Sequence, residues 1–189
     1  MAQNNEGSYG IITFGNDGPA TLIPFRVTES GSTYNTNAIS YFKNDYILAK
    51  RDNKNYLYSK LGVLVASSKF DIIEFTSPYL VVKDNGYILY KMSSNGDSGT
   101  IVSNEVDYIK LLNNYFVGIK NNKLNIYSFD DGKTGIISGG VELLTKDNEY
   151  HNYEVNIIAG GFEIKIKKAD NTYETYNYDM SGKLINNGE

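Results

Sequence analysis

One hairpin-like pattern recurs along the chain and constrains its fold more than any other feature. Its clearest copy covers residues 79–90, where Asp84-Asn85-Gly86 separates two runs rich in Tyr, Val, Ile and Leu. Asn-Gly between alternating apolar residues is the strongest short-range signal for a β-hairpin. Looser copies begin at Tyr46, Tyr115 and Phe162. The sequence therefore predicts a series of hairpins.

The hairpins recur with a nearly constant spacing, because Tyr46, Tyr79 and Tyr115 are 33 and 36 residues apart. Each hairpin is followed by a turn, a short apolar strand and an apolar–acid–apolar run, so each period contains four short strands. Units of this kind stack on one another to bury a core, and the propeller blade is the commonest four-stranded repeat of this length. We expect an all-β, propeller-like array of about four to five four-stranded antiparallel repeats with little or no helix, since no 3.6-residue apolar period is sustained.

The domain boundaries follow from the same pattern. We expect residues 1–8 to be a polar lead-in and residues 9–189 to form a single β-repeat domain. Residues near 145–161 break the period and are predicted to be an insertion. Insertions in repeat proteins lie in loops, often on a binding face. Pro24 cannot donate to a ladder, so the strand expected over residues 21–27 should lie at an edge or contain a bulge.

The composition excludes several classes of partner. The formal charge of −4 and the interspersed Lys, Asp and Glu argue against nucleic acid or an anionic membrane. With no cysteine, disulfides and thiolate metal sites are excluded. The first residues do not resemble a signal peptide, and no apolar run approaches the roughly 20 residues that span a bilayer. We expect a soluble protein that is cytoplasmic or assembled into a virion.

The first hairpin resembles a WG repeat. The residues concerned are Tyr9-Gly10-Ile11-Ile12, then Asp17-Gly18, then Leu22-Ile23-Pro24-Phe25. The WG pattern runs aromatic-Gly-aliphatic, Asp-x-Gly, then aliphatic-Ile-Pro, with Trp where this chain has Tyr9. The later units resemble the second half of such a repeat, for example at residues 70–73. This resemblance implies a β-propeller-like interaction module and suggests no reaction.

One segment matches a catalytic motif. Gly96-Asp97-Ser98-Gly99 has the core of the nucleophile motif of chymotrypsin-like proteases, and a serine nucleophile needs a base within hydrogen-bond reach. The chain has one histidine, His151, which follows the serine, opposite to the order in that family. Residues 93–99 also have the composition of a loop. We expect a turn here and no enzyme active site.

Recurring acids are the nearest approach to a metal site. Asp71, Asp107 and Glu142 are 36 and 35 residues apart and could form a ring of carboxylates. A residue repeated with the structural unit can instead serve that unit, by capping turn N–H groups or by placing charge on a strand edge. The Asp-Asn turns lack the acid pattern of a calcium loop. We expect no metal and no cofactor.

Tyrosine offers the most plausible binding surface, because it gives a large amphipathic contact area at low entropic cost. The chain has 17 Tyr, although Tyr in strands is also common in ordinary half-buried packing. The candidate surface consists of residues near the insertion and in the last hairpin: Tyr150, His151, Tyr153, Tyr173, Tyr176 and Tyr178.

These observations lead to two expectations about function. The first is a non-enzymatic structural module in a larger multi-subunit assembly, bound to copies of itself or to other chains. A virus (phage) particle is the example favoured by the Asn-, Ile-, Lys- and Tyr-rich composition, which fits an AT-rich genome and is shared by many bacteria. The alternative is a free-standing WG-type recognition module that binds a protein or a glycan through the Tyr-rich surface.

Overall fold

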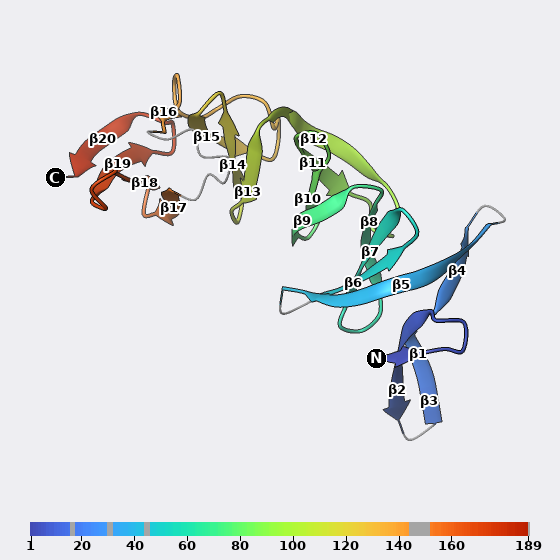
Figure 1. Ribbon diagram of the computed structural model, residues 1–189. Coiled ribbons are helices and arrows are strands. Elements are labelled where there is room, and N and C mark those ends of the chain that lie inside the picture. Colours follow the sequence, from blue (N-terminus) through green and yellow to red (C-terminus); the bar gives the residue numbers. More distant parts are fainter. Residues whose placement is uncertain (16–17, 30–31, 44–45, 144–151, 189) are drawn as a thin grey trace. The chain divides into compact units, whose positions relative to one another are not determined.

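The computed structural model covers residues 1–189 and describes all of them except 16–17, 30–31, 44–45, 144–151 and 189. The described residues form twenty β-strands and no helix (Figure 1), so none of them belongs to a helix that could cross a membrane. The strands make small antiparallel sheets that repeat along the chain. The predicted all-β, propeller-like array is confirmed.

The chain divides into two compact units. The first comprises Met1–Asp84 and Tyr90–Ile101, and the second comprises Asn85–Leu89 and Val102–Glu189. The first unit begins with a three-stranded sheet in the order β1-β2-β3 and continues with a five-stranded sheet in the order β4-β5-β6-β7-β8. Their bounds are β1 (Ala2–Gln3), β2 (Tyr9–Gly15), β3 (Gly18–Ile23), β4 (Arg26–Glu29), β5 (Ser32–Phe42), β6 (Tyr46–Arg51), β7 (Lys54–Ser59) and β8 (Leu64–Ser68).

The second sheet has a fifth strand because β5 is 11 residues long. Its first part, Ser32 to Asn35, pairs with β4, and the part from Thr36 to Phe42 pairs with β6. The strand predicted over residues 21–27 is divided in the structure: β3 ends at Ile23 and β4 begins at Arg26. Pro24 lies between them and has no N–H for a ladder, which explains the break.

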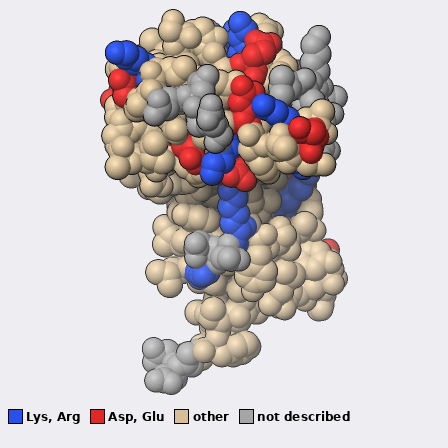
Figure 2. Space-filling view, turned by 90° about the vertical axis from the view of Figure 1, so that its left-hand side faces the viewer, with Lys and Arg blue, Asp and Glu red and all other residues tan. Residues whose placement is uncertain are grey.

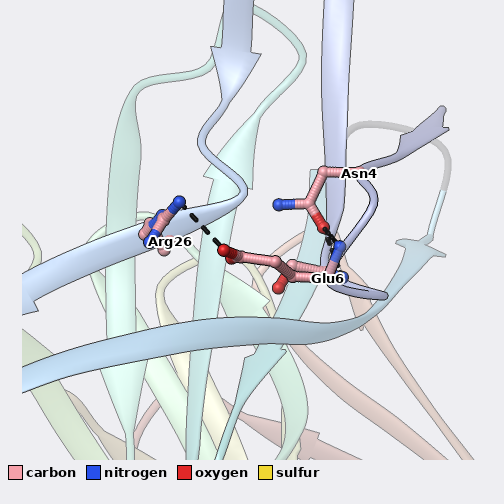
Figure 3. Close-up of polar contacts among 4 residues, drawn as sticks. Asn4, Glu6 and Arg26 are labelled. Carbon is pink, nitrogen blue, oxygen red and sulfur yellow. Dashed lines mark hydrogen bonds and ion pairs between the residues drawn. The ribbon is translucent and has the colours of Figure 1, made fainter.

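The lead-in, residues 1–8, contributes β1 to the first sheet. Asn4 holds the turn between β1 and β2, because its Oδ1 accepts hydrogen bonds from the backbone N–H groups of Glu6 (3.1 Å) and Ser8 (2.9 Å). The Glu6 carboxylate also forms a 3.4 Å ion pair with Arg26 of β4 (Figure 3). Both partners of this ion pair are more than half exposed, so it contributes little. The turn around Asn4 is therefore the main local constraint.

The WG-like segment owes its glycine to close packing. A Cβ on Gly10 would lie 2.9 Å from atoms of the Phe25 ring, so a larger residue would require that ring to move. Ile11, the next residue of β2, packs against a core that contains Ile23 of β3 together with residues of β6 and β7. The aromatic–glycine contact thus joins the start of β2 to the end of the same unit of sequence.

A buried arginine organises this core. Arg51, the last residue of β6, has 0% exposure. Its Nε donates to Thr36 Oγ1 (2.8 Å), its Nη1 to the Tyr58 hydroxyl (2.8 Å) and its Nη2 to the Pro24 carbonyl (3.2 Å). The guanidinium carbon also lies 4.6 Å from the centroid of the Tyr56 ring. Neutral oxygens and an aromatic face therefore solvate this charge and connect the segment after β3 to β5, β6 and β7.

A third sheet follows in the order β12-β11-β10-β9, and its strands contribute to both units. Its bounds are β9 (Asp71–Thr76), β10 (Tyr79–Lys83), β11 (Tyr87–Met92) and β12 (Gly99–Val106). The predicted turn at residues 84–86 joins β10 to β11, as expected. The acid run at Asp71 opens this sheet, so it pairs with the hairpin that follows it along the chain.

The second unit contains two four-stranded sheets, in the orders β13-β14-β15-β16 and β17-β18-β19-β20. Their bounds are β13 (Tyr108–Leu111), β14 (Tyr115–Lys120), β15 (Lys123–Ser128), β16 (Val141–Glu142), β17 (Tyr153–Ile158), β18 (Gly161–Lys167), β19 (Tyr173–Asp179) and β20 (Leu184–Gly188). The turn between β14 and β15 has positive φ at Asn121 (50°) and Asn122 (64°), as a two-residue hairpin turn requires. Both sheets contribute to one core, which includes Val117, Leu124, Phe162 and Ile164.

We expected the run that contains Glu142 to be the third equivalent of the runs at Asp71 and Asp107, and this expectation is wrong. Val141 pairs with Leu124 of β15, so β16 completes the sheet before it, and β17 opens the last sheet. The short apolar strand expected after the hairpin that begins at Tyr115 corresponds to residues 135–137. This segment forms only an isolated bridge between Gly135 and Tyr127. The Asn125 amide explains this: its Nδ2 donates to the Ile137 carbonyl (2.7 Å) and its Oδ1 accepts from the Ile137 N–H (2.9 Å). A side chain thus takes the place of a ladder.

We predict that Arg51→Ala lowers the stability of the first unit by about 3–5 kcal/mol, because it opens a cavity and removes three hydrogen bonds to a charged group. The measurement is urea unfolding followed by tyrosine fluorescence. The matched control is Lys50→Ala at the exposed neighbouring position, which should change stability by less than about 0.5 kcal/mol. Equal stabilities for the two variants would contradict this role for Arg51.

Candidate functional site

The structure distributes the predicted tyrosine surface over different environments. Tyr150 and His151 lie outside the described residues. Tyr153 opens β17 and is 7% exposed, and Tyr178 is similarly buried, so both belong to the core of the second unit. Tyr176 packs against that core, whereas Tyr173 is 51% exposed. Of the described members, only Tyr173 has a largely exposed side chain, and a joint binding role for the set stays a prediction.

The pKa values of the two core-facing tyrosines reflect this packing. The rings of Tyr176 and Tyr178 stack with centroids 6.4 Å apart. Burial, followed by a hydrogen bond to Glu174 and the charges of Glu174 and Tyr178, raises the pKa of Tyr176 to about 12. Burial also raises the pKa of Tyr178. Both phenols therefore remain neutral at physiological pH and act as packing groups with a polar end.

Two of the tyrosines that begin hairpins make contacts between neighbouring sheets. Tyr46 of β6 meets Phe75 of β9 edge to face with centroids 5.1 Å apart, and Tyr115 of β14 meets Phe162 of β18 in the same way at 5.1 Å. In an edge-to-face contact, the positive edge of one ring is attracted to the negative face of the other. The repeated Tyr found in the sequence therefore has a packing role at these positions.

A second aromatic series lies within the second unit. Tyr87, Tyr108 and Tyr153 follow one another with centroid separations of 5.2 Å and 6.4 Å. Lys110 Nζ lies 5.7 Å from the centroid of the Tyr153 ring. Each tyrosine is the first residue of its strand, β11, β13 or β17. The sequence signal that could have identified this series is a tyrosine at the first position of a predicted strand. The density of Tyr near the insertion does not identify it.

The protease-like motif forms a compact turn. Ser98 Oγ lies 3.1 Å from Ser93 Oγ, which in turn lies 2.9 Å from the Ser98 backbone oxygen and 2.5 Å from Asn95 Oδ1. Gly96 has φ +71° and packs so tightly that a Cβ would lie 2.5 Å from the Val65 carbonyl carbon. The serines thus bond one another in the loop, and His151 lies outside the described residues.

The recurring acids are not equivalent in the structure. Asp107 Oδ2 accepts a 2.8 Å hydrogen bond from the Asn121 N–H, so it caps the turn of its hairpin, one of the two roles expected for these acids. Asp71 is exposed at the start of β9. Glu142 lies in β16, 3.7 Å from Lys123 Nζ. Among the described residues, no group of three or more His, Cys, Asp or Glu is placed to hold a metal ion.

The surface charges are intermixed. Figure 2 shows Lys and Arg side chains beside Asp and Glu over the upper part of the face it draws. Ion pairs of this kind include Lys165–Glu163 (3.1 Å) within β18 and Lys168–Glu174 (4.0 Å). Exposed pairs add little to stability and are screened by salt. Opposite charges therefore lie close together on this face.

The last sheet has a largely exposed apolar end that the sequence analysis missed. Its register places Ile157 opposite Phe162, Phe162 opposite Tyr178 and Tyr178 opposite Leu184. The inner two are buried, whereas Ile157 is 41% and Leu184 44% exposed. Ile185 (54%) follows Leu184 directly, and Met180 (46%) lies four residues before it. The sequence signal that could have indicated this surface was the apolar pair Leu184-Ile185, which follows the turn at Gly182 and begins the edge strand β20.

Comparisons with known proteins do not assign a family. No protein-family model matches the chain, and no curated protein matches it. A solved structure of Hsv2 from Kluyveromyces lactis, with loop 6CD complete, aligns with a TM-score of 0.45 and 11% sequence identity. The alignment covers 93% of this chain and 61% of that one, so this chain spans about three fifths of its length. At this level the likeness supports no statement about function.

We predict that Asp107→Ala lowers stability by about 1 kcal/mol, because it removes a cap from the β14–β15 turn. Asp71→Ala is the matched control at the start of the preceding sheet and should cost less than about 0.5 kcal/mol. Urea unfolding of both variants is the measurement. Equal losses would show that the acids act as a set, as a carboxylate ring would require.

Proposed function

We propose that this protein is a non-enzymatic interaction module that acts as a subunit of a larger assembly. The observation that carries the proposal is the edge strand β20, which begins with two exposed apolar residues. A strand at the edge of a sheet presents backbone N–H and C=O groups that can pair with another chain. We propose that a second copy of this protein is the first partner to bind there.

β20 lies at the end of the order β17-β18-β19-β20, and its sequence, Leu-Ile-Asn-Asn-Gly, contains neither charge nor proline. The other edge strands have features that oppose pairing. Charged residues stand in β4, β9, β12, β13, β16 and β17, and Pro19 lies in β3. β1 has two residues, and the Gly96 loop packs closely on β8 at Val65. The one comparable feature of β20 is a register shift in its pairing with β19, between Asn177 and Tyr178.

Self-pairing suits this strand for a physical reason. Two copies related by a two-fold axis bring the same strand together in antiparallel orientation, so a charge near the axis would approach the same charge of the second copy. β20 has no such charge. Leu184 and Ile185 are 44% and 54% exposed, and covering a large aliphatic side chain contributes on the order of 1 kcal/mol. Backbone pairing would give affinity, and the apolar pair would set the register.

The wider assembly is part of the same proposal. A structural subunit needs surfaces for its neighbours and no catalytic group, and the Ser98 loop, whose serines bond one another, is consistent with that. We propose a virus (phage) particle as the assembly, on the support of the Asn-, Ile-, Lys- and Tyr-rich composition. The WG-like first hairpin supports the same general class of interaction module.

Multi-angle light scattering over a concentration series tests the proposal. We expect the wild type to reach twice the monomer mass. We expect Ile185→Lys to remain a monomer, because pairing of the edges would remove a charged side chain from water and place it near the lysine of the second copy. Ala169→Lys is the matched control, because Ala169 is exposed in the β18–β19 turn, and it should associate as the wild type does. A wild type that is monomeric at every concentration, or an Ile185→Lys variant that still associates, would contradict the proposal.

A further inference from the structure

A small pocket lies in the first unit, apart from β20. One wall is residues 67–70, the end of β8 and its connection to β9, and the other is the loop and strand start at residues 97–99. Its volume is about 180 Å³. Pockets for drug-sized ligands are larger, about 300–1,000 Å³. This pocket therefore suits one small ring, either a free molecule or one unit of a polymer.

The floor and the rim of the pocket differ in chemistry. Leu80, Met92, Tyr90 and Phe70 supply apolar surface, and the first two are buried. The polar lining groups are Ser67, Ser68, Lys69, Asp97 and Ser98. A few polar groups placed around an apolar floor are typical of small-molecule sites, where they orient the ligand. The ligand should therefore have an apolar face and a polar edge.

The two charged rim groups are not neutralised by ion pairs within the described part of the chain. Lys69 Nζ lies 4.8 Å from the centroid of the Phe70 ring. The Asp97 carboxylate has one polar contact, 3.5 Å from Ser93 Oγ, at the limit of a hydrogen bond. The Lys69 ammonium can donate hydrogen bonds, the Asp97 carboxylate can accept them, and the two charges sum to zero. The rim thus suits a neutral ligand that both donates and accepts hydrogen bonds.

Both walls are fixed before any ligand binds. The Phe70 N–H donates to Ser68 Oγ (2.9 Å), which holds the β8–β9 connection. The opposite loop is closed by backbone hydrogen bonds from Ser93 N–H to the Ser98 carbonyl (2.9 Å) and from Gly96 N–H to the Ser93 carbonyl (3.0 Å). A preformed site loses less conformational entropy on binding.

We propose that this pocket binds one sugar ring. A pyranose has an apolar C–H face, which would rest on the apolar lining of Leu80, Met92, Tyr90 and Phe70, and a belt of hydroxyl groups. Those hydroxyls would donate to the Asp97 carboxylate, accept from the Lys69 ammonium and exchange hydrogen bonds with Ser67 and Ser98. A site of this size on the first unit would let the protein recognise a glycan independently of self-association through β20.

Amide NMR spectra of the full chain, titrated with methyl glycosides of glucose, galactose, mannose and N-acetylglucosamine, test the proposal. We expect at least one sugar to cause saturable shifts at residues 67–70 and 97–99, with a Kd of about 1 mM. Asp97→Asn should weaken that binding at least about fivefold, because it removes a charged acceptor. Asp130→Asn, an exposed aspartate in the second unit, is the matched control and should bind as the wild type does.

A second variant and a second probe make the result decisive. Ser67→Ala should also weaken binding, and it replaces Asp97→Asn if that variant fails to fold. No saturable shift with any of the four glycosides would overturn the proposal, and so would shifts elsewhere or unchanged affinity in the pocket variants. Alanine, a zwitterion of similar charge balance, should cause no shifts, and binding of alanine alone would overturn the sugar assignment. Light scattering remains a separate measurement, so failure of either proposal is distinguishable.

Discussion

The structure depends on one constraint: a four-stranded sheet has two faces and is too small to bury either of them alone. In the second unit, residues of two sheets meet in one core, with Tyr115 edge to face on Phe162. In the first unit, Tyr46 makes the matching contact with Phe75. A strand-opening tyrosine is long enough to reach the neighbouring sheet and polar enough to end near solvent. This explains the tyrosine at the start of the hairpins that begin at residues 46 and 115.

Local features of the sequence were sufficient for the fold class but not for the grouping of strands. The turn at residues 84–86 is specified by its own residues, so it was predicted correctly. The pairing of Val141 with β15 was not predicted correctly, because it depends on Asn125. The Asn125 side chain forms hydrogen bonds with the backbone of Ile137 and keeps residues 135–137 out of the sheet. The burial of Arg51 depends equally on partners distant in sequence, Pro24 and Thr36. Non-local hydrogen bonds leave no local pattern.

The candidate sites show the same division. The density of Tyr was the strongest compositional signal, yet Tyr153 and Tyr178 lie in the core of the second unit. The two surfaces proposed for binding rest on weaker signals. β20 is distinguished by the absence of charge, and the pocket by Lys69 and Asp97, which come together only because two connections lie side by side in the first unit. In this protein, aromatic residues pack neighbouring sheets together, and the proposed binding surfaces are an edge strand and a pocket between two connections.

The most direct test of this account is a double-mutant cycle between Tyr115 and Phe162, each replaced by Leu to retain apolar bulk. If the strand-opening tyrosines couple neighbouring sheets, urea unfolding should give an interaction energy of about 0.5–1.5 kcal/mol between the two positions. Additive losses, with an interaction energy below about 0.3 kcal/mol, would contradict the account, because the sheets would then be held together without the contact that the repeated tyrosines provide.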